Sequence, residues 1–190
     1  KLGLKGSPTA ELNFNGSVGY LIGKAGKGFS YMLQLMNDSR IGVGFQGVGL
    51  MEATYRLARD YAENRVTWGK PIAKHELIAE KLLDLEVELR AIRSFAYKTA
   101  FHRSFDYAAS EYLKRTEGVK EFREGVRLKM LKSKRIVRRN TPLLKYWVGE
   151  KSVEHARSCL QILGGYGYTT EYRAEAWLRE SVIYALYEGT

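Results

Sequence analysis

Residues 78–99, IAEKLLDLEVELRAIRSFAYKT, carry the most regular apolar pattern in this 190-residue chain and decide its fold class. Apolar or small residues recur there at alternating steps of four and three: Ile78, Leu82, Leu85, Leu89, Ile92, Ala96 and Thr99. Two such positions in every seven residues form a stripe along an α-helix, which is typical of a helix that packs against other helices. The pattern predicts a helix over about 75–110.

Helical patterns also flank this stretch. Upstream, an apolar stripe predicts a helix over about 28–66. Its internal glycines each cost about 1 kcal/mol relative to alanine, so we expect close packing against that backbone. Downstream, Thr141-Pro142 is typical of an N-cap and first helical residue, and Gly164-Gly165 of a helix end, which predicts a third helix between them. A shorter helix is expected over about 173–182.

Residues 1–27 differ from the rest of the chain in composition. Glycines and a Ser7-Pro8 step break them into short pieces, and residues 11–14 alternate polar and apolar side chains as a strand can. About two short strands do not make a stable sheet alone. We therefore expect residues 1–27 to be the C-terminal remnant of a β domain and residues 28–190 to form a helical domain. The predicted fold class is mainly α, an antiparallel up-down helical bundle preceded by a short β remnant.

The composition excludes several classes of protein. A hydrophobic content of 45% excludes a disordered chain, and one cysteine excludes an intramolecular disulfide framework. No apolar run approaches the roughly 20 residues that a membrane span needs. The net charge is +10, but residues 114–139 hold 11 Lys and Arg against 3 Glu. We interpret residues 111–140 as a basic insertion, either a solvated helical connection or a contact to another domain or an acidic partner, so nucleic-acid binding is not favoured.

Three segments are candidates for a functional site, each with a plainer alternative. The segment Gln161–Tyr168 joins a helix end to a glycine loop, which is either a simple cap or bare backbone against a flat or phosphorylated ligand. Glu188 follows the apolar run 182–186; it is either a solvated charge or a base, since an apolar pocket raises the pKa of a carboxyl group. Arg65 and Trp68 come at a helix end; they are either an ordinary terminus, where the helix dipole favours basic residues, or a phosphate-binding arginine with an aromatic platform beside it.

The histidines and the cysteine do not indicate a metal site. His75, His102 and His155 have no ligand-like spacing with one another or with Cys159. Cys159 lies on the apolar stripe of the third helix, so we expect it in the core.

Taken together, these segments resemble the acyl-CoA dehydrogenase family. Residues 1–14, KLGLKGSPTAELNF, are similar to the last strands of that family's middle β domain, and residues 21–29, LIGKAGKGF, to its junction with the C-terminal helical domain. The long connection at 111–140 followed by Thr141-Pro142 resembles the larger bacterial members. The resemblance implies α,β-dehydrogenation of an acyl-CoA thioester to a trans-2-enoyl-CoA, with a base that removes the α-proton and FAD that accepts a hydride.

The resemblance also implies roles for individual residues. Glu188 matches the catalytic base; some members instead carry the base at the position of Ser39. Asn37, Arg40 and Gly189 match residues that contact the substrate. The residues that match flavin contacts, shared across a homodimer or homotetramer, are Arg65, Trp68, His75, Gln161, Ile162, Leu163, Gly164, Gly165 and Thr190. Trp68 replaces the usual Phe and Glu76 a common Gln.

The resemblance implies electron-transfer flavoprotein as the electron acceptor and a cytoplasmic protein in bacteria, or a matrix protein in mitochondria. The alternatives are an acyl-CoA oxidase, a DNA-associated alkylation-response flavoprotein of the same fold, and a non-enzymatic helical module.

The match begins late in the family's domain order, so we expect this chain to be a fragment that is inactive alone and retains little FAD. Stoichiometric flavin absorbance in the purified 190-residue chain would contradict this expectation.

Overall fold

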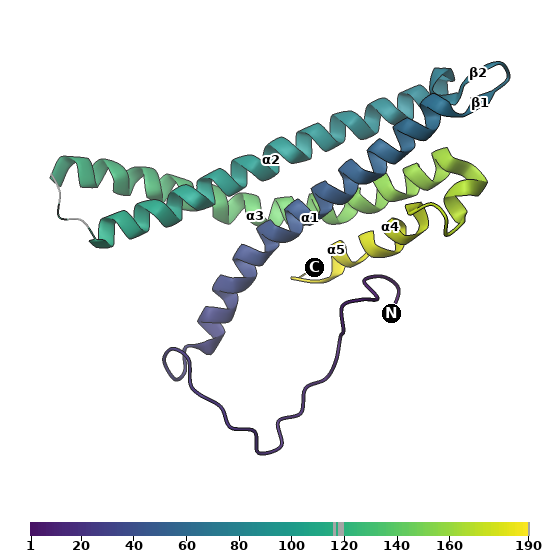
Figure 1. Cartoon of the computed structure of the whole chain (residues 1–190). Coiled ribbons are helices and arrows are strands. Elements are labelled where there is room, and N and C mark those ends of the chain that lie inside the picture. The colour runs from purple at the N-terminus through teal and green to yellow at the C-terminus, as the bar shows by residue number, and fades with distance from the viewer. Residues whose placement is uncertain (116, 118–119, 190) are drawn as a thin grey trace.

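The computed structural model describes residues 1–115, 117 and 120–189. Its helices are α1 (Gly28–Asn64), α2 (Glu76–Arg115), α3 (Lys120–Leu163), α4 (Ala174–Ser181) and α5 (Ile183–Leu186). Two short antiparallel strands, β1 (Val66–Thr67) and β2 (Lys70–Pro71), and a 3-10 turn, η1 (Ile72–Lys74), connect α1 to α2; a second 3-10 turn, η2 (Gly164–Tyr168), follows α3. The three long helices alternate in direction, and α4 and α5 return along α3 (Figure 1). The mainly α, antiparallel bundle is confirmed.

The predicted apolar stripe of α2 faces the core. Its members from Leu85 to Thr99 are buried, and Ile78 and Leu82 are half-buried against the same cluster. Met51 of α1 and Leu144 of α3 are fully buried opposite them. Cys159 lies in this core as expected, and burial raises the pKa of its thiol to about 12. The residues of α2 that the heptad pattern predicts to face other helices therefore do line the core between α1, α2 and α3.

Two of the glycines in α1 allow α3 to approach closely. A Cβ atom on Gly44 would lie 2.7 Å from Cδ2 of Leu144, and one on Gly47 would lie 2.0 Å from Cγ1 of Val148. By contrast, a Cβ on Gly42 or Gly49 would meet no atom within 4 Å. The expected close packing is confirmed at Gly44 and Gly47 only.

The predicted start of the third helix is wrong. α3 begins at Lys120, and Pro142 lies inside it. An internal proline removes one helical hydrogen bond, but α3 contacts α2 before this point as well as after it. His102 Nδ1 lies 3.0 Å from Ser133 Oγ, and Asn140 Nδ2 donates to Thr99 Oγ1 at 3.4 Å. Both contacts precede Pro142; after it, Lys151 Nζ lies 3.3 Å from Glu88 Oε1 of α2, so contacts with α2 lie on both sides of the proline.

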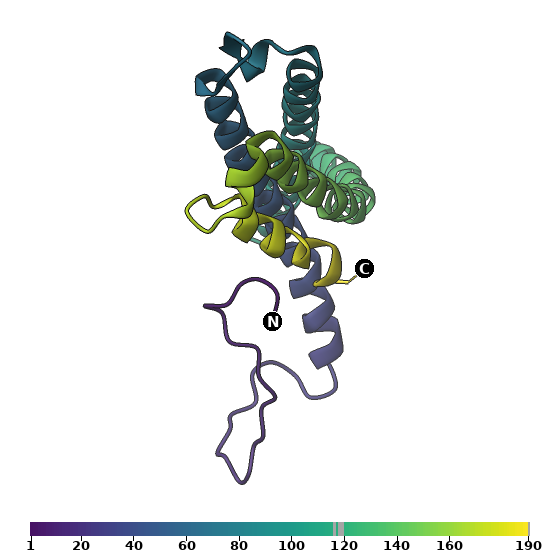
Figure 2. The ribbon, with the colours of Figure 1, turned by 90° about the vertical axis from the view of Figure 1, so that its right-hand side faces the viewer.

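Residues 1–27 leave the bundle as an extended segment without a strand (Figures 1 and 2). The strand expected at residues 11–14 is therefore wrong for this chain, because a strand needs a partner for its backbone N–H and C=O groups and no described residue supplies one. The segment contacts the bundle near its first residues, where Arg179 Nη1 of α4 donates to the Leu2 carbonyl oxygen at 3.0 Å. Its origin in a β domain stays a prediction.

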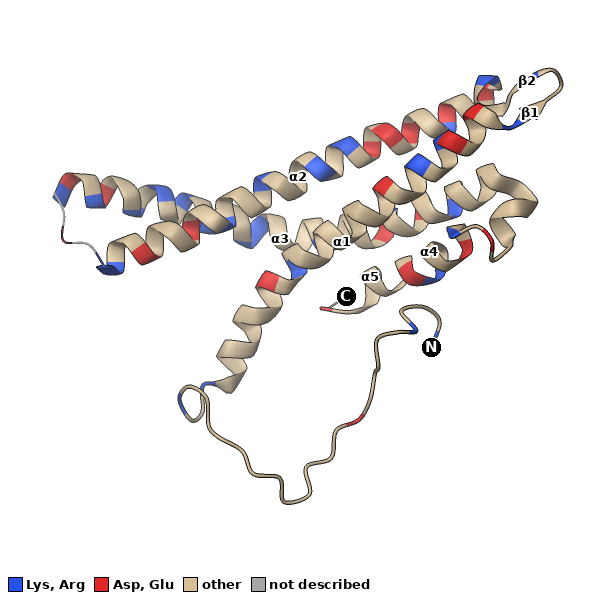
Figure 3. Ribbon diagram, in the orientation of Figure 1, with Lys and Arg blue, Asp and Glu red and all other residues tan. Residues whose placement is uncertain are grey.

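The basic residues of 114–139 lie on the helical hairpin formed by the end of α2 and the start of α3 (Figure 3). Nearly all of these side chains are exposed, and Arg123 is half-buried. The described basic side chains are therefore accessible in this chain, and the solvated connection, the contact to another domain or partner and the role as an insertion all stay predictions. Among the described helices, none combines the length and the apolar character that crossing a membrane requires.

A buried histidine makes the stability of this fold depend on pH. His155 is fully buried, its Nε2 atom lies 3.6 Å from Glu88 Oε2, and burial lowers its pKa from 6.5 to about 4. The unfolded chain therefore binds this proton more tightly than the folded chain. We expect about 3 kcal/mol of stability, present above pH 6.5, to be lost as the pH falls to about 4.

This loss is measured by chemical denaturation at a series of pH values. His155→Gln, which cannot take up the proton, should show a shallower decline than the wild type over the same range. Equal slopes for the two proteins would contradict the assignment to His155.

Candidate active site

The C-terminal turn after α5 places Glu188 against α1. Glu188 has a φ of +60° and Gly189 a φ of +88°, so the chain reverses sharply there. The carbonyl oxygen of Glu188 accepts a hydrogen bond from Arg40 Nε at 2.7 Å. The φ of Gly189 favours glycine at this position, and a Cβ there would lie 2.6 Å from Arg40 Nη2, so the guanidinium would have to shift.

The carboxylate of Glu188 meets the hydroxyl group of Ser39. Ser39 Oγ donates to Glu188 Oε2 at 2.7 Å, across 149 residues of sequence. Both side chains are half-buried. The structure thus brings together the two positions at which the resemblance implies a base. On the side of α1 the contacts of Glu188 are polar, from Ser39 and Arg40. The expected apolar pocket around the carboxylate stays a prediction.

Lys145 of α3 supports the same turn, and sequence reasoning missed it. This lysine is only 5% exposed, and its Nζ donates to the Ala185 carbonyl oxygen at 2.9 Å. Burial and, to a lesser extent, the charge of Arg40 lower its pKa. Gly149, one turn along α3, lets the α5 backbone approach: a Cβ there would lie 3.0 Å from Ala185 Cα. In the sequence, a lysine at a position of the apolar stripe of α3 is the feature that indicates a buried lysine with a specific partner.

The residues expected to contact the substrate lie on the same side of the bundle. Asn37 and Arg40 both line a cavity of about 740 Å³ between α1, α2 and α3. Next to them, Asp38 accepts two hydrogen bonds from Arg103 of α2, at 2.7 and 2.8 Å. The structure therefore joins Asn37, Arg40, Gly189 and Glu188 in one region.

Most of the residues expected to contact the flavin surround a second hollow. This hollow, of about 500 Å³, lies where α1 and α3 end, and its lining includes Arg65, Ile162, Leu163, Gly164 and Gly165. The Arg65 guanidinium lies over the ring of Tyr166, 5.8 Å from its centroid. A Cβ on either glycine would meet no atom within 4 Å, so the backbone there is bare.

Two more of the residues expected to contact the flavin lie beside this hollow: Trp68 in the β1–β2 hairpin and His75 just after η1. Trp68 and Gly69 both have positive φ values, of 48° and 78°, as a two-residue type I′ hairpin turn requires. Trp68 is 94% exposed. The centroids of its ring and the His75 ring lie 5.8 Å apart, in a T-shaped arrangement. Gln161 is exposed on the last turn of α3 and does not line the hollow. Thr190 lies outside the described residues. This hairpin was not predicted from the sequence, although Gly69 is typical of the second residue of such a turn.

The two groups of residues do not lie together in one chain. Ser39 and Arg65 are 26 positions apart on and just after α1, which corresponds to about 39 Å along a helix. Within the part of the chain that the structure describes, no three His, Cys, Asp or Glu side chains are grouped as metal ligands.

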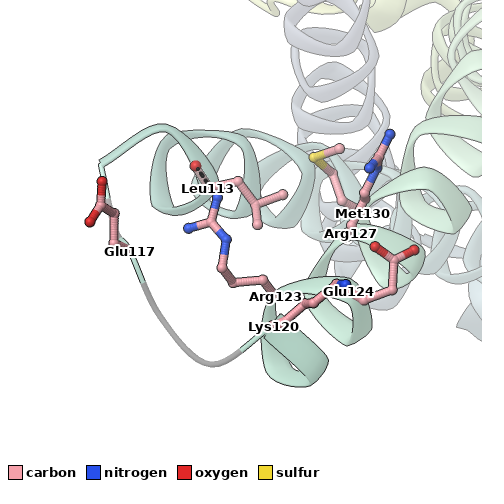
Figure 4. A pocket seen from close by; sticks show the side chains of 7 residues that line it. All are labelled: Leu113, Glu117, Lys120, Arg123, Glu124, Arg127 and Met130. Atoms are coloured by element: carbon pink, nitrogen blue, oxygen red, sulfur yellow. Dashed lines mark hydrogen bonds between the residues drawn. The ribbon is translucent and has the colours of Figure 1, made fainter.

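A third hollow, of about 610 Å³, lies at the tip of the α2–α3 hairpin, away from Glu188 (Figure 4). Arg123 crosses it, and its Nη2 donates to the Leu113 carbonyl oxygen at 3.0 Å. Its other lining residues are Glu117, Lys120, Glu124, Arg127 and Met130. None of them is a predicted site residue, so this hollow is not part of the candidate active site.

Comparison with known proteins agrees with this architecture. The sequence profile described as "Acyl-CoA dehydrogenase, C-terminal domain" matches residues 26–114 and 125–190. An acyl-CoA dehydrogenase of Bacillus subtilis is 33% identical to this chain. The match covers the whole of this chain and 44% of the length of the relative. A solved acyl-CoA dehydrogenase complexed with FAD, from Bacillus anthracis, is 27% identical with a TM-score of 0.71, over 88% of this chain and 27% of that one.

A chain in a solved structure of the electron transferring flavoprotein of Acidaminococcus fermentans also matches, with a TM-score of 0.68 and 26% identity, over 88% of this chain and 37% of that one. Because the family profile matches most of its residues, the chain belongs to the acyl-CoA dehydrogenase family and comprises its C-terminal domain. It spans about two fifths of the length of the curated relatives that it matches.

Proposed function

We propose that this chain is the base-bearing part of an FAD-dependent acyl-CoA dehydrogenase, which converts an acyl-CoA thioester to a trans-2-enoyl-CoA. The observation that carries the proposal is the contact between Ser39 and Glu188, because it holds a half-buried carboxylate at a defined point beside the cavity that Asn37 and Arg40 line. Membership of the family supports the reaction class.

In this proposal each residue of the turn has a distinct task. Glu188 removes the α-proton of the thioester, and the Ser39 hydroxyl orients its carboxylate by the hydrogen bond to Oε2. The backbone N–H of Glu188 donates to the thioester carbonyl oxygen, where negative charge develops as the proton leaves. Arg40 and Lys145 fix the turn through backbone carbonyl oxygens, at 2.7 and 2.9 Å, so that the base and this N–H keep their positions.

The hollow at the ends of α1 and α3 fits part of a flavin nucleotide. Bare backbone at Gly164 and Gly165, the guanidinium of Arg65 and the ring of Tyr166 together offer space, positive charge and an aromatic surface. In the proposal Arg65, Trp68, His75 and residues 161–165 hold the cofactor. The chemistry that FAD supplies when bound is acceptance of the hydride from the β-carbon.

The distance between the two groups of residues supports a flavin shared between subunits. Ser39 beside the base and Arg65 beside the hollow are separated by about 39 Å along α1. Residues at the Arg65 end would therefore serve the flavin of a partner subunit in a homodimer or homotetramer. The oxidised enzyme would be restored by electron-transfer flavoprotein, and the matching structure titled for that protein supports this partner.

The proposal is tested by anaerobic addition of acyl-CoA thioesters to the full-length protein, with the flavin absorbance recorded. Bleaching of the flavin is the expected result, followed by faster reoxidation with electron-transfer flavoprotein than with oxygen. Faster reoxidation by oxygen would indicate an acyl-CoA oxidase instead. Absence of bleaching with thioesters of every chain length would contradict the proposed function.

A further inference from the structure

The side of α3 that points away from the bundle combines exposed apolar and basic side chains. Its exposed residues recur at steps of three and four, so they share one face of the helix. This outer face consists of Leu128, Leu131, Lys132, Arg135, Arg139, Leu143 and Tyr146. Its four apolar members are between 43% and 68% exposed, whereas Ser133, Asn140 and Leu144 on the opposite side of α3 are buried. The outer face is therefore accessible and is not part of the core.

The charge of the outer face has one sign only. Between Glu124 and Glu150 the sequence holds eight Lys and Arg and no Asp or Glu, and most of these cations lie on the first half of α3 (Figure 3). Lys132, Arg135 and Arg139 form no ion pair with any residue that the structure describes. Because like charges repel, the same face of a second copy of the chain is disfavoured as its partner. The outer face therefore fits an anionic partner.

The shape of the outer face favours a lipid surface over a protein. None of its residues lines any of the three hollows described above. Tight protein interfaces are built around side chains that fill pockets, and the convex side of one helix offers no pocket. The outer face extends about 27 Å along α3 from Leu128 to Tyr146. Leucine and tyrosine side chains interspersed with lysine and arginine along such a face are typical of helices that lie on anionic membranes.

We infer that the outer face of α3 docks the protein on an anionic lipid surface, an inference that goes beyond the proposed function and does not depend on it. In this arrangement α3 lies parallel to the membrane plane. The three leucines and Tyr146 enter the headgroup region, where the tyrosine ring is apolar at its body and polar at its tip. Lys132, Arg135 and Arg139 contact the lipid phosphate groups. No part of the chain crosses the membrane in this mode of binding.

The inference is tested by co-sedimentation of the full-length protein with lipid vesicles. The protein should bind vesicles of mixed phosphatidylglycerol and phosphatidylcholine at least about tenfold more tightly than vesicles of phosphatidylcholine alone. The triple variant Lys132→Ala/Arg135→Ala/Arg139→Ala should weaken binding to the anionic vesicles by about a hundredfold, roughly fivefold for each charge.

A second variant tests the apolar part of the outer face separately. Leu128→Ser/Leu131→Ser keeps every charge and should weaken binding to the anionic vesicles by about tenfold. Because the substituted side chains of both variants are exposed, their helical circular dichroism should match that of the wild type. A loss of binding with this spectrum unchanged therefore reports the surface and not the fold.

The matched control is Lys24→Ala/Lys70→Ala/Lys74→Ala, which removes the same charge from exposed positions outside α3 and should bind as the wild type does. A wild type that does not sediment with anionic vesicles, or a Lys132/Arg135/Arg139 variant that sediments equally well, would overturn the inference. Binding to polyglutamate that this variant loses, without any binding to vesicles, would also overturn it and would indicate an acidic protein. Flavin reduction by acyl-CoA without vesicles tests the proposed function alone, so the two claims can fail separately.

Discussion

Replacement of Glu188 by glutamine in the full-length protein is expected to slow flavin reduction by acyl-CoA by about 10²- to 10⁴-fold and to leave the flavin bound. The amide keeps the size of the carboxylate and can still accept a hydrogen bond from Ser39, but it cannot take up the α-proton. The rate is measured by anaerobic rapid mixing with acyl-CoA, and flavin content by the absorbance of the purified variant.

The control for this variant is Glu80→Gln, which makes the same change at an exposed position of α2. It should reduce its flavin at the wild-type rate. Undiminished flavin reduction in Glu188→Gln would mean that another group removes the proton.

A large loss of stability is expected for Gly47→Leu. The Cβ atom alone would lie 2.0 Å from Val148 Cγ1, and Val148 is fully buried, so neither helix can move aside without disturbing the core. Overpacking of this kind costs about 3 kcal/mol in the free energy of unfolding, which exceeds the gain in helix propensity of roughly 1 kcal/mol. Chemical denaturation monitored by circular dichroism measures the difference.

Gly42→Leu provides the matched control on the same helix. Its Cβ meets no atom within 4 Å, so only the helix propensity changes and the variant should be as stable as the wild type or slightly more stable. Similar stabilities for the Gly42 and Gly47 variants would show that α1 and α3 do not pack as closely as the 2.0 Å distance at Gly47 indicates.

The helices could be predicted where an apolar period continues to the end of the element. The stripe ending at Thr99 predicted the core face of α2, and the Gly164-Gly165 pair predicted the end of α3. The start of α3 could not be predicted, because its first turns are strongly charged and Pro142 imitates a helix start. Contacts across the hairpin, such as that of Asn140 with Thr99, decide this boundary, and no local pattern contains them.

The resemblance names the residues of the candidate site, whose roles stay predictions, but it does not give their geometry. The resemblance implied roles for Glu188 and Arg40, yet the contact that holds the carboxylate crosses 149 residues to Ser39. The role of Lys145 could not be predicted, because the carbonyl oxygen that it binds, that of Ala185, lies 40 residues away in the sequence.

The contact between Ser39 and Glu188 also indicates that a carboxylate from either position reaches the same point. Ser39 Oγ and Glu188 Oε2 are 2.7 Å apart, so a glutamate at position 39 should place its carboxylate close to the missing one in a Glu188→Gln background. The double variant Ser39→Glu/Glu188→Gln therefore tests the position of the base separately from the identity of the residue that carries it.

Washout of deuterium from the α-carbon of an acyl-CoA thioester tests the assignment of the base most directly, because it reports proton removal alone. We expect the full-length wild type to exchange this deuterium with solvent, Glu188→Gln to lose the exchange, and Ser39→Glu/Glu188→Gln to regain part of it. Exchange at the wild-type rate in Glu188→Gln would contradict the central claim that Glu188 is the base.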